Sequence, residues 1–213
     1  MPWPPRQPAR SEIAPEDMEA YEFTIERAGR HAGAPDPETD AAYYGHLLLS
    51  AQTSLRLGQL GVYFRALGER GDSFSHGDRE FVDQVFAADW KTNCVAEWHI
   101  NDALSTGVRL EAIEALRYGR EHELTEREAL LASFIRKVVT GKMDADTWNR
   151  VEADMGERGV MDYACFILFL QTTMRGIQLT SGGQEPSDEF IDQMIADFKS
   201  GKRQIDDHRK RIG

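Results

Sequence analysis

Apolar residues recur at steps of three and four positions along most of this chain, which is the periodicity of an amphipathic helix. The segment from 39 to 70 follows this pattern and is expected to form two helices with a break near 50–54. The segment from 78 to 90 places Phe81, Val85 and Phe86 on one side. Sustained alternation of apolar and polar residues, which is typical of strands, does not occur. The sequence therefore predicts an all-α fold.

Several expected helix ends coincide with capping residues. Ser75 or Asp78 can cap the helix that leads to the segment around residue 90. Thr125 is followed at the third position by Glu128, which is the pattern of a capping box. We expect that helix to end at Gly141, because glycine commonly follows the last helical turn.

The later part of the chain predicts two helices over 144–159 and 160–182, followed by a last amphipathic helix over 187–201. The helix over 160–182 is apolar nearly all round, so we expect it to be central. Its cysteine, Cys165, is then expected to lie in the core, since free cysteine is among the most buried residue types.

The domain organisation follows from proline and charge. Prolines at positions 2, 4, 5 and 8 predict a flexible arm over residues 1–14. No stretch reads as an interdomain linker, so a single helical domain is expected over residues 15–200. Basic residues dominate the tail over residues 201–213.

Composition excludes several classes of partner. The 213 residues carry a formal net charge of -11, which argues against nucleic acid and anionic membrane surfaces. No apolar run approaches the roughly 18 residues of a membrane span, and the N-terminus lacks the apolar core of a signal peptide. The two cysteines cannot form a disulfide framework and match no zinc-ligand spacing. We expect a cytoplasmic protein without a metal or cofactor.

Candidate chemistry is concentrated in the segment from 89 to 108, which contains Cys94, Glu97 and His99. A helical residue advances by about 100°, so Cys94 and Glu97 do not share the face of His99. A histidine near neutrality can act as general acid or base, and Glu80 or Asp102 could orient it. The alternative from the residues alone is a histidine that is satisfied within the core.

The segment 97–116, EWHINDALSTGVRLEAIEAL, resembles the carboxymuconolactone decarboxylase and AhpD-like alkylhydroperoxidase superfamily. The matching positions are His99, Ala103, Gly107, Glu111, Ile113 and Leu116, and a weaker likeness extends over about 44–179. The resemblance implies an AhpD-like, all-helical domain that assembles as a homodimer, homotrimer or homohexamer. It also implies active sites walled by helices, a small-molecule substrate and no obligatory cofactor.

The peroxidase branch of this superfamily has a Cys-x-x-Cys pair seven and four residues before the histidine. Carried over by position, these cysteines fall on Thr92 and Val95, while the relay glutamate falls on Glu80 and the histidine on His99. Cys94 falls where the peroxidase has another relay histidine. Because peroxidase turnover by this route needs two thiols, Cys94 would need a resolving thiol from elsewhere.

The lactone decarboxylase branch commonly has glutamates four and two residues before the histidine, where this chain has Val95 and Glu97. The resemblance thus implies a cofactor-independent enzyme that acts on a small organic acid or lactone. His99 would be its general acid and base, with Glu80 setting its protonation and Glu97 and Cys94 as second-rank candidates. Two alternatives stay open: an AhpD-like antioxidant with Cys94 as its single redox centre, and a non-catalytic oligomeric scaffold.

Overall fold

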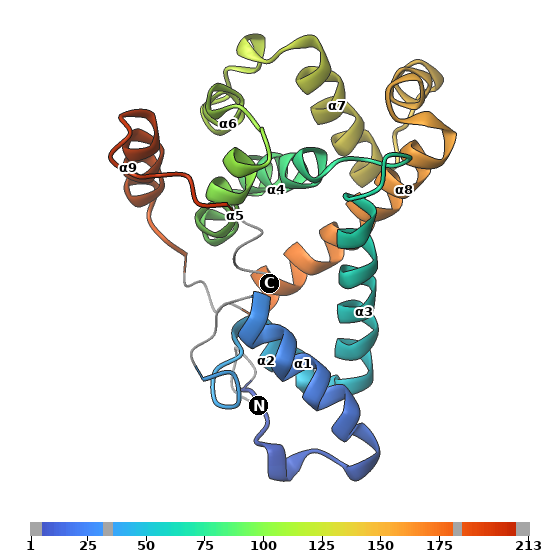
Figure 1. Cartoon of the computed structure of the whole chain (residues 1–213), viewed down its shortest axis with the longest axis vertical. Coiled ribbons are helices and arrows are strands. Elements are labelled where there is room, and N and C mark those ends of the chain that lie inside the picture. Colours follow the sequence, from blue (N-terminus) through green and yellow to red (C-terminus); the bar gives the residue numbers. More distant parts are fainter. Residues whose placement is uncertain (1–5, 32–35, 181–184, 208–213) are drawn as a thin grey trace. The chain divides into compact units, whose positions relative to one another are not determined.

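The structure is a computed structural model, and it describes residues 6–31, 36–180 and 185–207 (Figure 1). All the regular elements within these ranges are helices, which confirms the predicted all-α fold. The α-helices are α1 (Met18–His31), α2 (Ala42–Leu47), α3 (Ala51–Leu67), α4 (His76–Trp90), α5 (Asn93–Ser105), α6 (Leu110–Arg117), α7 (Glu126–Thr140), α8 (Ala145–Thr180) and α9 (Asp188–Lys199). Short 3-10 helices cover Arg10–Glu12, Pro15–Asp17, Leu48–Ser50 and Glu121–Glu123.

The predicted caps are present. Ser75 is the N-cap of α4, and its hydroxyl accepts a hydrogen bond from the backbone N–H of Asp78. Thr125 and Glu128 form the capping box of α7, and Gly141 ends that helix in the left-handed conformation with φ 66°. The break expected near 50–54 lies slightly earlier, at the 3-10 turn Leu48–Ser50 between α2 and α3.

Element α8 confirms one expectation and corrects another. The two helices predicted over 144–159 and 160–182 are both present within Ala145–Thr180, and they are separated at Gly156, whose backbone is non-helical with φ 79° and ψ 164°. The prediction that Cys165 lies in the core is wrong, because its side chain is exposed. Met161 and Leu168, four residues before and three residues after it, are also exposed and share its face of α8. Only the opposite face of this apolar helix is buried.

The chain divides into two compact units. The first contains the described residues up to Tyr63 together with 175–180. In its core, Ala20 of α1 packs with Ala51 and Leu55 of α3. The described part of the N-terminal arm contacts this unit, since Gln7 Oε1 accepts a hydrogen bond of 2.7 Å from the backbone N–H of Ala41. Residues 1–5 of the predicted arm lie outside the described residues.

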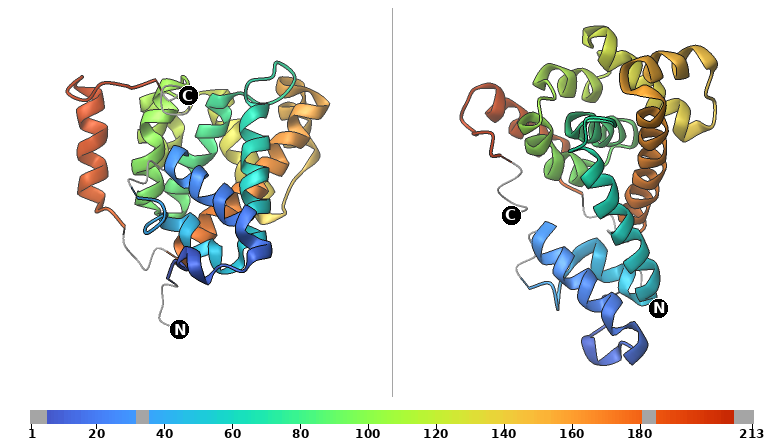
Figure 2. Two further views of the ribbon diagram at one scale, coloured as in Figure 1. Left: turned by 60° about the horizontal axis from the view of Figure 1, so that its bottom comes forward. Right: turned by 45° about the vertical axis from the view of Figure 1, so that its right-hand side comes forward.

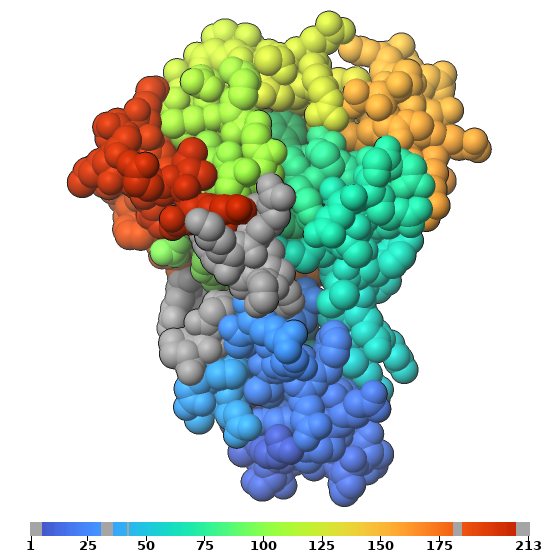
Figure 3. All heavy atoms as spheres, in the orientation of Figure 1, coloured from blue at the N-terminus to red at the C-terminus, as the bar shows by residue number. Residues whose placement is uncertain are grey.

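The second unit contains residues 64–174 and 185–207. Within it α4 and α5 run side by side (Figures 1 and 2). The aromatic rings of Phe74 and Phe166 stack with centroids 5.2 Å apart, and Tyr163 donates a hydrogen bond of 3.1 Å to the backbone carbonyl of Asp78. The C-terminal helix α9 lies beside α5 and α6 (Figure 3). These contacts hold α4 and α5 in a packed helical layer.

The start of the basic tail also contacts this unit. Asn101 of α5 donates to the backbone carbonyl of Asp206 at 3.0 Å, and its own Oδ1 accepts from the backbone N–H of Asp206 at 2.9 Å. The expected single domain over 15–200 stays a prediction. None of the described helices has both the length and the apolar character needed to cross a membrane.

Candidate functional site

Helix α4 carries charged residues on a face that the fold buries. Glu80 and Asp83 are 0% and 1% exposed, although they stand among the buried apolar residues Phe81, Val82 and Val85. The side chain of the neighbouring Arg79 is only 13% exposed. Three charged groups in the interior need partners, because an isolated buried charge is strongly unfavourable.

The partner comes from α5, which follows α4 after a two-residue connection. Lys91 ends α4 in the left-handed conformation, with φ 52° and ψ 48°, and Thr92 is the N-cap residue of α5. The tight reversal makes α4 and α5 neighbours. His99 therefore lies opposite Glu80 and Asp83, although 19 residues separate it from Glu80.

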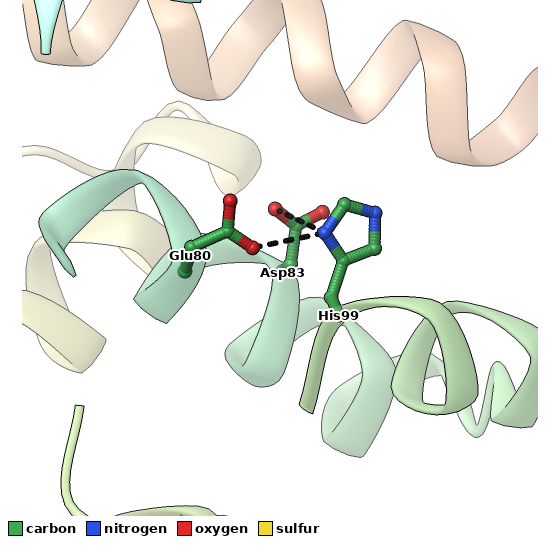
Figure 4. Close-up of side chains that lie close together, drawn as sticks. All are labelled: Glu80, Asp83 and His99. Atoms are coloured by element: carbon green, nitrogen blue, oxygen red, sulfur yellow. Dashed lines mark hydrogen bonds and ion pairs between the residues drawn. The ribbon is translucent and has the colours of Figure 1, made fainter. Parts of the chain in front are cut away.

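The imidazole of His99 faces both carboxylates through the same nitrogen (Figure 4). Its Nδ1 lies 2.9 Å from Glu80 Oε2 and 3.6 Å from Asp83 Oδ2. The first distance is that of a hydrogen bond donated by Nδ1–H, and the second is that of an ion pair. The other ring nitrogen, Nε2, points away from both carboxylates (Figure 4). The His99 side chain is 28% exposed.

Glu80 is the centre of the cluster because each of its carboxylate oxygens has a partner. Oε1 forms an ion pair with the guanidinium of Arg79, and Oε2 accepts from His99. Burial alone would raise the pKa of this carboxyl, but the positive charges of Arg79 and His99 outweigh burial and lower it to about 2. Glu80 is therefore ionised throughout the physiological range.

The same contacts favour the charged form of His99. Burial would lower its pKa, but the nearby carboxylates of Asp83 and Glu80 raise it to about 9. Asp83 behaves differently, because burial raises its pKa to about 7; the positive charge of His99 opposes this rise, and the negative charge of Glu80 adds to it. The cluster is electrically neutral when Arg79 and His99 carry positive charges and both acids are ionised.

Asp83 was not among the predicted site residues. Its Oδ2 faces His99, while its Oδ1 is buried without a hydrogen-bond partner in the part of the chain that the structure describes. A sequence signal did exist, since Asp83 stands three residues after Glu80 and so shares its face of α4. Acids at such spacing usually face solvent, so this signal does not by itself indicate burial.

Glu80, Asp83 and His99 also present three donor atoms of the kind that hold divalent metals, all within 4.8 Å of one another. The charge balance argues against this use. The guanidinium of Arg79 already binds Glu80, so a divalent cation would bring two more positive charges beside a neutral imidazole. A proton on His99 balances the same acids completely. We interpret the cluster as a centre that holds a proton.

The structure does not bring Cys94 or Glu97 into this cluster. Cys94 is buried at the start of α5, where its backbone N–H donates to Glu185 Oε2 at 2.7 Å and its Sγ lies 3.4 Å from Glu185 Oε1. Burial and the adjacent carboxylate raise the pKa of the Cys94 thiol to about 12. Glu97 is half-buried on α5, two residues before His99 and therefore turned well away from it.

The two positions that correspond to the cysteines of the peroxidase branch, Thr92 and Val95, lie at the start of α5 and are buried. Thr92, at the N-cap of α5, is 1% exposed, and Val95 is completely buried. Asp102, the second acid considered for His99, accepts a hydrogen bond from Asn101 at 3.2 Å. Of the predicted site residues, Glu80 and His99 are the two that contact each other.

Comparison of the chain with protein-family models, with curated proteins and with solved structures gives no match. The likeness to the carboxymuconolactone decarboxylase and AhpD-like superfamily therefore stays an expectation drawn from the sequence.

Proposed function

We propose that this chain is a cofactor-independent enzyme, similar to carboxymuconolactone decarboxylases, that uses His99 for acid and base chemistry on a small organic acid or lactone. One observation carries this proposal. The buried carboxylate of Glu80 binds Nδ1 of His99, while Nε2 is directed away from the cluster on a side chain that is 28% exposed. An imidazole fixed at one nitrogen can exchange a proton through the other.

The reaction we propose is proton transfer coupled to loss of a carboxyl group. The bond between the substrate carbon and its carboxylate breaks, carbon dioxide leaves, and the electron pair is delocalised into a neighbouring carbonyl or lactone group. The Nε2 proton of His99 is then transferred to that carbon, and solvent restores the proton on the imidazole. Glu80 stabilises the imidazolium form and fixes the ring, which is the role of a carboxylate beside a catalytic histidine.

The thiol alternative has less support. A peroxidatic cysteine reacts as its thiolate, and Cys94 is buried beside Glu185, whose negative charge opposes thiolate formation. Cys165 is exposed but lies on α8 rather than beside Cys94 on α5. The surroundings of Cys94 are therefore the opposite of the electropositive ones that activate a thiol.

The scaffold alternative predicts a histidine enclosed in the core. Glu80 is enclosed, since its side chain is 0% exposed, but the His99 side chain is 28% exposed and is not enclosed. The polar pair therefore extends from the interior to the surface, which favours a role in contact with a bound molecule.

Self-association is part of the proposal. The exposed residues Met161, Cys165 and Leu168 form an apolar stripe along one face of α8. A helix that leaves such a stripe uncovered is a reasonable surface for another copy of the chain. The order of assembly, whether homodimer, homotrimer or homohexamer, can be measured by light scattering.

The experiment is a substrate screen with matched variants. The wild type, His99→Gln and Cys94→Ser are incubated with small carboxylic acids and lactones in the presence of EDTA, and products are followed by proton NMR and carbon dioxide release. We expect turnover by the wild type and Cys94→Ser, and a loss of roughly a hundredfold or more in His99→Gln. Equal rates in the wild type and His99→Gln would exclude the proposed role of His99, and loss of turnover in Cys94→Ser would favour the thiol alternative.

A further inference from the structure

Asp83 is the member of the cluster that the proposed function does not use. Its side chain is 2% exposed, its Oδ2 is 3.6 Å from His99 Nδ1, and its Oδ1 has no hydrogen-bond partner in the described part of the chain. Burying a carboxylate with an unsatisfied oxygen costs free energy, so such a group needs a nearby positive charge or must remain protonated. Arg79 also acts on Asp83, but its guanidinium is paired with Glu80, so among the described residues His99 is the cation in ion-pair contact with Asp83.

Other charged groups surround Asp83 and His99, but none of those described below replaces His99 as the ion-pair partner of Asp83. On α4, Arg79 and Glu80 form an ion pair, and Arg65 of α3 acts on Glu80. Asp102 of α5 acts on Asp83, but its charge is negative. Tyr163 of α8 is buried and remains neutral, because burial raises its pKa well above the usual value. The carboxylates of Glu80 and Asp83 are therefore balanced by the guanidinium of Arg79 and the imidazolium of His99, with Arg65 as a further positive charge that acts on Glu80.

We propose that Asp83 is a positioning residue that keeps His99 protonated on both nitrogens, so that the site presents an Nε2–H to an anionic substrate. Glu80 fixes the ring by accepting the Nδ1 proton. Asp83 adds a second negative charge on the same side of the ring, beyond the one that a Glu–His pair supplies. This inference rests on the proposed function, because a doubly protonated His99 is useful only if the substrate of that function is an anion.

The consequence is a direction for the first proton transfer. A neutral imidazole would begin as a base, whereas the imidazolium begins as an acid and also attracts a carboxylate or an enolate. When the Nε2 proton moves to the substrate carbon, His99 becomes neutral, its Nδ1–H stays bound to Glu80, and Asp83 loses its counter-charge. That unbalanced carboxylate favours recovery of the proton from solvent, which resets the site.

The test measures the charge of His99 directly and needs no substrate. The chain contains six histidines, so the His99 resonance is identified as the one missing from His99→Gln in nitrogen-15 spectra of labelled protein. We then follow its titration in the wild type and in Asp83→Asn, which has nearly the same shape without the charge. We expect the midpoint of His99 to fall by about 1 to 3 units in Asp83→Asn.

Asp102→Asn is the matched control, because it removes an acid three residues after His99 on α5 that is not in the cluster. We expect a shift of a few tenths of a unit there. A His99 midpoint in Asp83→Asn that stays within roughly 0.3 units of the wild-type midpoint overturns the proposal. So does an equal shift in both variants.

Two further outcomes are decisive. If Asp83→Asn does not fold, Glu80→Gln decides: with Glu80 neutral and Asp83 intact, a His99 midpoint still above the usual value of about 6.5 supports the proposal, and one at or below that value overturns it. Stoichiometric binding of Zn²⁺ that needs Glu80, Asp83 and His99 together also overturns it, because a metal would replace the proton. If His99 titrates as expected but no substrate is turned over, the proposed function fails while the role of Asp83 stands.

Discussion

Helix α5 places two reactive side chains beside carboxylates, Cys94 next to Glu185 and His99 next to Glu80, with opposite chemical results. The carboxylate beside the imidazole stabilises its charged form, and together with Asp83 it raises the pKa of His99 to about 9. Burial and the carboxylate beside the thiol destabilise the thiolate, raising the pKa of Cys94 to about 12. A neighbouring negative charge stabilises the ionised form of an imidazole, which is positive, and destabilises the ionised form of a thiol, which is negative.

The two carboxylates also differ in how they are held. Glu80 is completely buried, and both of its oxygens have charged partners, whereas Glu185 is exposed and contacts the backbone and thiol of Cys94. The buried acid is thus part of the structure as well as of the site. The exposed acid caps the first turn of α5, where the backbone N–H groups favour a negative charge.

The largest expected effect is on stability, and it distinguishes Glu80 from Glu185. Glu80→Ala leaves Arg79 without its ion-pair partner in the interior, so we expect the free energy of unfolding to fall by about 3 kcal/mol. Urea denaturation followed by circular dichroism measures this value. Glu185→Ala is the control and should cause a much smaller loss, because water can replace an exposed carboxylate. Equal losses in the two variants would contradict the distinction.

The next effect concerns the two cysteines. In the native protein at pH 8, iodoacetamide should alkylate exposed Cys165 at least roughly a hundredfold faster than Cys94, whose burial and acidic neighbour oppose the thiolate. Mass spectrometry of peptides over time gives both rates. The same reaction in urea should remove the difference. Preferential labelling of Cys94 in the native state would restore it as a redox candidate.

A pH effect of intermediate size is expected at the cluster. The pKa of His99 is raised in the folded state, so its stabilising contribution is complete below its unfolded pKa of 6.5 and is lost as the pH rises toward about 9. The raised pKa of Asp83, about 7, acts in the same direction at lower pH. The free energy of unfolding of the wild type should therefore decrease between pH 6.5 and 9, and that decrease should be smaller in His99→Gln. Parallel curves for the two proteins would show that His99 is not linked to folding.

The smallest effect refines the thiol side of the comparison. Removing the charge of Glu185 by Glu185→Gln should raise the alkylation rate of Cys94 by no more than about tenfold, because burial, the larger cause of its high pKa, remains. Cys165 provides the internal reference in the same sample. An increase that made Cys94 as reactive as Cys165 would show that the carboxylate, rather than burial, suppresses the thiol.

The helices and their caps could be predicted from the sequence, because both depend on neighbours within a few residues. The Thr125 capping box and the end of α7 at Gly141 are examples. The contact of Glu80 with His99 was expected from the family resemblance at a separation of 19 residues, and the structure has that contact.

Contacts that depend on tertiary packing could not be predicted in the same way. Asp83 reads as a solvent-facing acid until α5 covers it, and Glu185 reaches Cys94 across 91 residues. Cys165 shows the reverse error, since an apolar sequence does not reveal which face of a helix stays uncovered. In each case the missing information was which surface packs against which, and periodicity does not contain it.

The short connection between α4 and α5 fixes the spacing of the site. Only Lys91 and Thr92 separate the two helices, and Lys91 achieves the reversal in a left-handed conformation that few residues adopt readily. Adding one residue there would rotate every following side chain of α5 by about 100° and carry the imidazole away from both acids. Most loops tolerate changes in length, but a related protein with the same site would need a connection of the same length between these two helices.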